Sequence, residues 1–99
     1  MATAVYVAEC FWTGLREEDL RAVSRRIEAA IAAVGDDGPV SYLGWLLVLD
    51  DEVVLVLLEG PRGAVQRVAE HAALPFGRIL QVAHAPWPPN PQTDEEAKQ

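Results

Sequence analysis

The longest apolar segment of the chain runs from residue 40 to residue 60 and is interrupted once, by an acidic triplet at 50–52. Successive side chains of a strand point to opposite faces, so a sheet with one wet face shows alternating apolar and polar residues. Here both alternating sets are apolar, namely Leu43, Trp45, Leu47 and Leu49 on one face and Tyr42, Leu46 and Val48 on the other. The pattern predicts a hairpin of strands 40–49 and 53–59 that is covered on both faces.

Two further strands and two helices are predicted on either side of this hairpin. Residues 4–11 are rich in β-branched and aromatic types and predict the first strand. Apolar residues recur every three or four positions over 16–34, which predicts a long amphipathic helix. A shorter helix over 62–73 follows Pro61, because proline favours the first turn of a helix, and 78–84 is the predicted last strand.

The order of these elements predicts the fold class. Strand, helix, strand, strand, helix, strand is the order of ferredoxin-like α+β folds. Right-handed crossovers then give an antiparallel sheet of strand order 4-1-3-2, with both helices on one face. Because the hairpin is apolar on both faces, the helix-free face must meet another sheet, most simply that of an identical copy related by a two-fold axis. We therefore expect a homodimer.

Composition narrows the classes of partner. The 99 residues fit one domain, predicted over 1–87, followed by a mobile Pro-rich and acidic tail over 88–99. Acidic residues outnumber basic ones by 15 to 8, which argues against nucleic acid or a membrane surface as partner, since both are bound through clustered Lys and Arg. Cys10 is the sole cysteine, and the start of the chain lacks a basic segment typical of a secretion signal. We expect a cytoplasmic protein.

Several short segments between residues 4 and 84 carry a resemblance to a known family, namely 9–15 (ECFWTGL), 17–20 (EEDL), 42–44 (YLG), 51–53 (DEV), 58–61 (LEGP) and 74–79 (LPFGRI). Together they resemble the small nickel-binding ferredoxin-like family, long catalogued as a domain of unknown function. The resemblance implies a dimeric α+β barrel and, in at least one branch, bound nickel as the only cofactor suggested. Trp45 and Leu46 depart from the smaller residues expected after the YLG segment, and Arg16 stands where a capping Ser or Thr is usual.

Metal ligands are the first class of candidate site residues. The sequence has no Gly-rich phosphate loop, no nucleophile elbow and no paired His or Cys at metal spacing. The predicted topology leaves two separate donor sets, namely His71 with Glu9 and Cys10, and His84 with Glu59. The alternative is that His71 is a surface residue of the helix and that His84 stands at the end of a strand. Borderline divalent ions usually require three or four protein donors, so we expect nickel binding to be weak or absent.

Aromatic residues and one charged pair form the second class of candidate site residues. Trp12, Tyr42 and Trp45 are candidates to line a pocket for an organic ligand, with packing in the core or the dimer interface as the alternative. Glu9 should lie opposite Arg78 on the neighbouring strand, either as a structural ion pair or in a binding or acid–base role. Cys10 is a buried small residue or a reactive thiol. Trp87, between prolines, docks on the body, docks on the other subunit or is exposed.

Two classes of function follow. The preferred one is a binding or accessory module that holds an apolar organic molecule or a metal ion in a dimeric barrel, and it needs no catalytic group. The alternative is a cofactor-free enzyme acting on an apolar small molecule, such as a monooxygenase, isomerase or cyclase, by analogy of fold. A hollow dimer interior into which Glu9, His71 or His84 points would favour the enzyme, and a filled interior would favour the module.

Overall fold

The computed structural model of the chain describes residues 4–35 and 38–83. In chain order the elements are β1 (Ala4–Phe11), the 3-10 helix η1 (Glu17–Asp19), α1 (Leu20–Ala33), β2 (Ser41–Val48), β3 (Val53–Gly60), α2 (Arg62–His71) and β4 (Phe76–Val82). Every predicted strand and helix is present, and their ends differ from the predicted ones by a few residues. The predicted tail, together with His84 and Trp87, lies outside the described residues.

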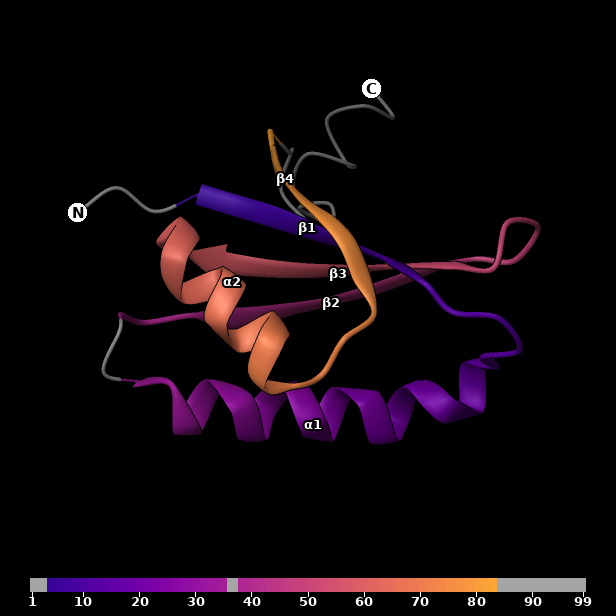
Figure 1. Cartoon of the computed structure of the whole chain (residues 1–99), viewed down its shortest axis with the longest axis horizontal. Coiled ribbons are helices and arrows are strands. Elements are labelled where there is room, and N and C mark those ends of the chain that lie inside the picture. The colour runs from indigo at the N-terminus through magenta and orange to yellow at the C-terminus, as the bar shows by residue number, and fades with distance from the viewer. Residues whose placement is uncertain (1–3, 36–37, 84–99) are drawn as a thin grey trace, which may run out of the picture.

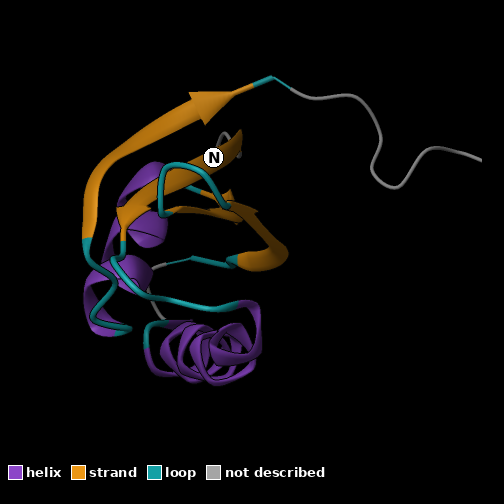
Figure 2. Ribbon diagram, turned by 90° about the vertical axis from the view of Figure 1, so that its right-hand side faces the viewer, coloured by secondary structure: helices purple, strands orange, loops and turns teal. Residues whose placement is uncertain are grey.

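The four strands form one antiparallel sheet in the order β2-β3-β1-β4, which is the predicted order read from the other edge. Both helices lie on the same side of this sheet (Figures 1 and 2). The predicted ferredoxin-like α+β fold is therefore confirmed. No helix within the described ranges is long and apolar enough to cross a membrane.

The core lies between the helices and one face of the sheet. Residues at alternate positions of the central strands β1 and β3 point into it, and the apolar stripes of α1 and α2 cover them. The buried members are Tyr6, Ala8 and Cys10 of β1, Val54, Val56 and Leu58 of β3, Leu20, Val23, Ile27 and Ala30 of α1, and Val65, Val68 and Ala69 of α2. The spacing of three and four residues in the helices accounts for this burial.

The predicted faces of β2 are wrong in one respect, because the strand contains a β-bulge. The register of β2 against β3 shifts between Tyr42 and Gly44, and the extra residue changes which side chains share a face. Gly44 has a φ of 137°, a conformation that favours glycine. Tyr42, Trp45 and Leu47 consequently all pack against the core on the helix side, whereas the prediction separated Tyr42 from the other two.

The face of the sheet away from the helices, called the open face below, consists of rungs of paired residues. From one end to the other the rungs are Ser41–Glu59–Val5–Val82, Gly44–Leu57–Val7–Leu80, Leu46–Leu55–Glu9–Arg78 and Val48–Val53–Phe11. Most of these side chains are apolar, and several are strongly exposed: Phe11 at 60%, Leu46 at 48% and Leu80 at 38%. The second apolar face predicted from the sequence therefore exists on the side of the sheet away from both helices, and Val5 at 4% and Val53 at 9% are the buried residues on it.

Candidate functional site

Glu9 and Arg78 form an ion pair on the open face. They lie directly opposite each other on the adjacent strands β1 and β4, and Arg78 Nε donates to Glu9 Oε1 at 2.8 Å. The Glu9 side chain is 20% exposed, whereas that of Arg78 is 63% exposed. The pairing expected from the topology is thus present, with its carboxylate mostly covered and its guanidinium mostly open.

The surroundings of this pair are apolar. Leu46 and Leu55 complete its own rung, and the two neighbouring rungs supply Leu57, Val7 and Leu80 on one side and Val48, Val53 and Phe11 on the other. The next charge on this face, Glu59, lies two rungs away at the far end of β3. The open face therefore presents one charged pair among apolar side chains.

The first predicted set of metal ligands is not brought together. Cys10 points to the helix side and is fully buried, whereas Glu9, its neighbour in the strand, points to the open face. His71 is exposed at the end of α2 and lines a groove with Ala33 and Val34 of the helix layer. The sheet separates this layer from Glu9.

The other groups with metal-binding chemistry do not assemble either. Within 4–35 and 38–83, no three His, Cys, Asp or Glu side chains are grouped so that they could hold a metal ion. His84 of the second predicted set lies outside these ranges. Burial raises the pKa of the Cys10 thiol to about 11, so the thiol is neutral at physiological pH. A neutral thiol is neither a good metal ligand nor a good nucleophile.

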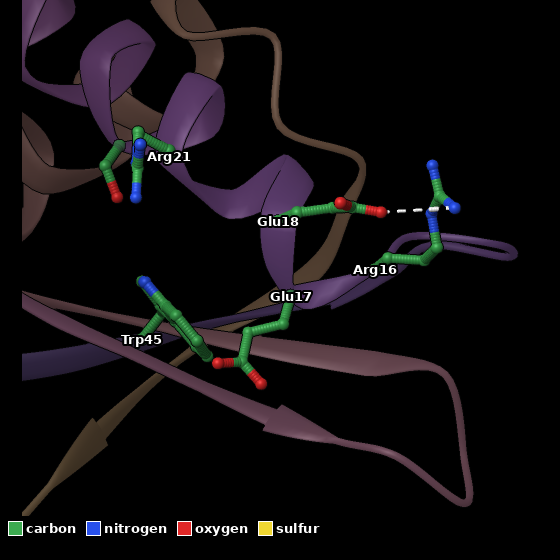
Figure 3. A pocket seen from close by; sticks show the side chains of 6 residues that line it. Arg16, Glu17, Glu18, Arg21 and Trp45 are labelled. Carbon is green, nitrogen blue, oxygen red and sulfur yellow. Dashed lines mark ion pairs between the residues drawn. The ribbon is translucent and has the colours of Figure 1, made fainter.

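The three candidate aromatic residues are not gathered at one place in the single chain. Trp45 borders an open groove of about 790 Å³ between β2 and the start of the first helix, together with Arg16, Glu17, Glu18, Arg21 and Ser24 (Figure 3). The Tyr42 hydroxyl forms a hydrogen bond of 2.8 Å with Ser24 Oγ. Burial is the main cause that raises the pKa of Tyr42, with a smaller contribution from the Glu28 charge, while the Ser24 hydrogen bond lowers it. Trp12 lies elsewhere, beneath the guanidinium of Arg26.

Sequence reasoning missed this groove. The prediction placed Trp45 on a face shared with Leu43. The available signal was the spacing of Glu17 and Arg21, which puts both on one side of the helix. Only the bulge in β2 brings Trp45 beside them, because it turns that side chain towards the helices.

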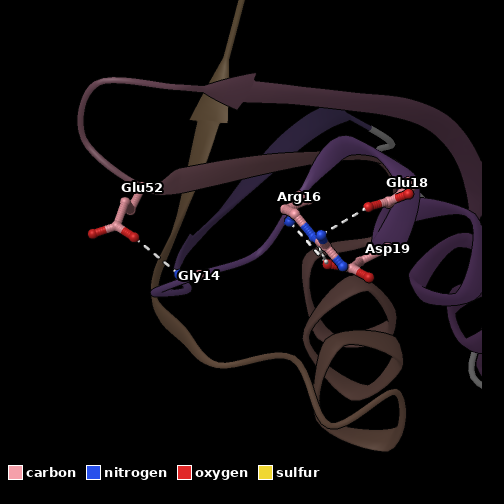
Figure 4. A network of polar contacts seen from close by, with 5 residues as sticks. All are labelled: Gly14, Arg16, Glu18, Asp19 and Glu52. Atoms are coloured by element: carbon pink, nitrogen blue, oxygen red, sulfur yellow. Dashed lines mark hydrogen bonds and ion pairs between the residues drawn. The ribbon is translucent and has the colours of Figure 1, made fainter.

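A network of polar contacts joins the hairpin tip to the segment between β1 and α1 (Figure 4). Gly14 N donates to Glu52 Oε2 at 2.9 Å, and Trp12 N donates to Glu52 O at 3.0 Å. Further along, Arg16 N donates to Asp19 Oδ2 at 2.9 Å, as in half of a capping box. The hairpin end of the open face is therefore tied to the body of the protein.

The comparisons with known proteins concern the fold. No family model matches the chain, and no curated protein matches it. Among solved structures, that of SCO4226 from Streptomyces coelicolor A3(2) superposes with a TM-score of 0.64 at 25% identity, over 84% of this chain and 100% of that chain. The structure of Rv0793 from Mycobacterium tuberculosis gives a TM-score of 0.45 at 15% identity, over 89% of this chain and 100% of that one. The first likeness supports the ferredoxin-like fold.

Proposed function

We propose that the protein is a small-ligand binding module that works as a homodimer. The open faces of two copies pack against each other, and an apolar organic molecule is held between them. The observation that carries this proposal is the open face itself, where Phe11 is 60% exposed, Leu46 is 48% exposed and Leu80 is 38% exposed. These side chains share one face of the sheet with the partly buried Val7, Leu55 and Leu57, and a large apolar patch usually marks an interaction site.

The energetics favour a second copy over water. Fully burying a leucine or phenylalanine side chain contributes about 1.5–3 kcal/mol, so covering each half-exposed one contributes on the order of 1 kcal/mol. A sheet packs well against another sheet about 10 Å away. An identical sheet offers the same apolar rungs, and a two-fold axis closes the assembly at two copies. The exposed row of apolar rungs supports this arrangement.

Sedimentation at micromolar concentration tests the association. We expect the wild-type chain to sediment as a dimer and the Leu46→Glu variant to sediment as a monomer, because the variant places a charge within the proposed interface. Ala29→Glu is the matched control, since Ala29 is exposed on α1 and the change of charge is the same. A soluble wild-type monomer, or a Leu46→Glu dimer, would show that the open face is not the interface.

Calorimetric titration with 1-decanol, an uncharged apolar molecule, tests the ligand. We expect the wild-type dimer to bind decanol and the Leu46→Glu monomer to lose this binding, because the proposed cavity exists only between two copies. A dimer that takes up no decanol would indicate a filled interface and would contradict the ligand-binding part of the proposal.

A further inference from the structure

We infer that the bound molecule carries an anionic oxygen head group, such as a carboxylate, and that Arg78 holds this group. The inference rests on the proposed function, because it names the chemical class of the molecule held at the open face. It is carried by the unequal exposure of the Glu9–Arg78 pair and by the apolar rungs on both sides of that pair.

The guanidinium of Arg78 has donors to spare. An arginine side chain offers five N–H donors in a planar fork. Of these, only Nε is engaged by a described residue, in the hydrogen bond of 2.8 Å to Glu9 Oε1. With the Arg78 side chain 63% exposed, the terminal nitrogens have no hydrogen-bond partner among the described residues. The free edge of the fork is available to a ligand.

Covering the open face makes these donors costly to leave unpaired. A buried donor without a partner costs about 1–3 kcal/mol, and more when the group is charged. A carboxylate matches the arginine fork with two parallel hydrogen bonds, which an alcohol cannot do. Closing the dimer removes the water molecules that accept hydrogen bonds from Arg78, and a ligand with an anionic oxygen head group supplies acceptors in their place.

The other residues of the open face favour a ligand with an apolar chain and disfavour a ligand with a cationic head group. Leu57, Val7 and Leu80 lie on the rung beside the pair, so an alkyl chain that extends from the head group meets only apolar side chains there. A cationic head is disfavoured, because Glu9 already accepts from Arg78 and only 20% of the Glu9 side chain is exposed. The predicted class is thus a medium-chain carboxylic acid or a molecule of similar shape.

The experiment compares three probes of equal chain length by calorimetry on the full-length protein: decanoate, 1-decanol and decylamine, each below its micelle-forming concentration. We expect decanoate to bind the wild-type protein at least about fivefold more tightly than decanol, as a charge-assisted fork requires. Arg78→Gln should abolish this preference and keep decanol binding. Arg25→Gln on the exposed side of α1 is the control, since it changes the net charge equally and should keep the preference.

A second variant guards against misfolding, because Arg78→Gln leaves the Glu9 carboxylate without its cation. The double variant Glu9→Gln with Arg78→Gln replaces the ion pair by neutral polar side chains, and it should bind decanol without preferring decanoate. Equal wild-type affinity for decanoate and decanol, a preference for decylamine, or a decanoate preference that survives both variants would overturn the inference and leave the proposed function standing. Absence of binding of all three probes would overturn both.

Discussion

Arg26 of α1 holds the end of α2 from across the helix layer. Its Nε donates to Ala72 O at 3.1 Å and its Nη2 donates to Ala73 O at 3.0 Å, while its guanidinium lies over Trp12 at 5.7 Å from the ring centroid. The last carbonyls of a helix lack partners within the helix. One side chain therefore satisfies the end of α2, stacks on an aromatic ring and fixes the start of the turn to β4.

Removing this side chain should destabilise the fold. We expect Arg26→Ala to lower the free energy of unfolding by about 2 kcal/mol, since hydrogen bonds from charged groups contribute about 1.5–3 kcal/mol. Arg26→Lys should restore only part of the loss, because a single ammonium cannot reproduce the fork or the stacking. Urea denaturation measures both variants. The neighbouring Arg25→Ala is the control, and a loss for Arg26→Ala no larger than the control's would contradict the capping role.

Cys10 should make stability depend on pH in the alkaline range. Burial raises the pKa of the thiol in the folded state to about 11, whereas an unfolded cysteine ionises near about 8.5. Above the lower value the unfolded chain loses the proton first, so ionisation favours unfolding. The contribution of the neutral thiol is complete below about pH 8.5 and is lost as the pH rises towards 11.

The measurement is the difference in unfolding free energy between the wild type and Cys10→Ala, because ionisation of the tyrosines and lysine cancels in it. We expect the advantage of the wild type to shrink steadily from pH 8.5 to the highest pH at which both proteins fold. A difference that stays constant with pH would mean that the thiol is as accessible to water in the folded state as in the unfolded one.

At the scale of single elements, the bulge in β2 depends on a backbone conformation that glycine adopts easily. Gly44 has a φ of 137°, and a Cβ added there would meet no atom within 4 Å. Gly44→Ala should therefore destabilise through backbone strain alone, by about 1–2 kcal/mol. Gly63→Ala in α2 is the control, because Gly63 has equally open space and a helical position where Ala is preferred. Thermal denaturation compares the two, and equal effects would contradict the argument.

The elements and their order could be predicted from the sequence, and the faces of one strand could not. Hydrophobic period distinguishes helices from strands and, with the handedness rules, fixes the sheet order. A bulge residue such as Leu43 does not alter the overall apolar character of the strand, yet it places Tyr42 and Trp45 on the same face. The only local signal was Gly44 within an apolar strand, which is a weak one.

The candidate site, too, could be predicted from the sequence only in part. The pairing of Glu9 with Arg78 follows from topology, because the end of β1 must lie beside the start of β4. The candidate metal ligands His71, Glu9 and Cys10 are not brought together. Their grouping considered positions along the sheet and did not consider the face of the sheet to which each side chain points. Neighbouring residues of one strand face opposite sides, and a helix residue can reach only one of them.

At the scale of the whole molecule, weak or absent nickel binding remains a prediction. A tight site requires three or four donors, and within the described ranges no three suitable side chains are grouped. Titration of the metal-free protein with nickel should give no submicromolar binding, and His71→Ala and His84→Ala should change the result little. Submicromolar affinity lost in either variant would show that donors meet across the two-fold axis or involve residues outside those ranges.

The central place of β1 in the sheet has a consequence for how the chain acquires its structure during synthesis. β1 is synthesised before both of its partners, β3 and β4, so Val5 waits for Glu59 on one edge and for Val82 on the other. Such long separations between partners slow folding, because chain closure precedes any gain from contact. Until β4 emerges, β1 has an unpaired edge and an apolar surface in the open. The nascent chain is therefore expected to need protection from aggregation until β4 has been translated.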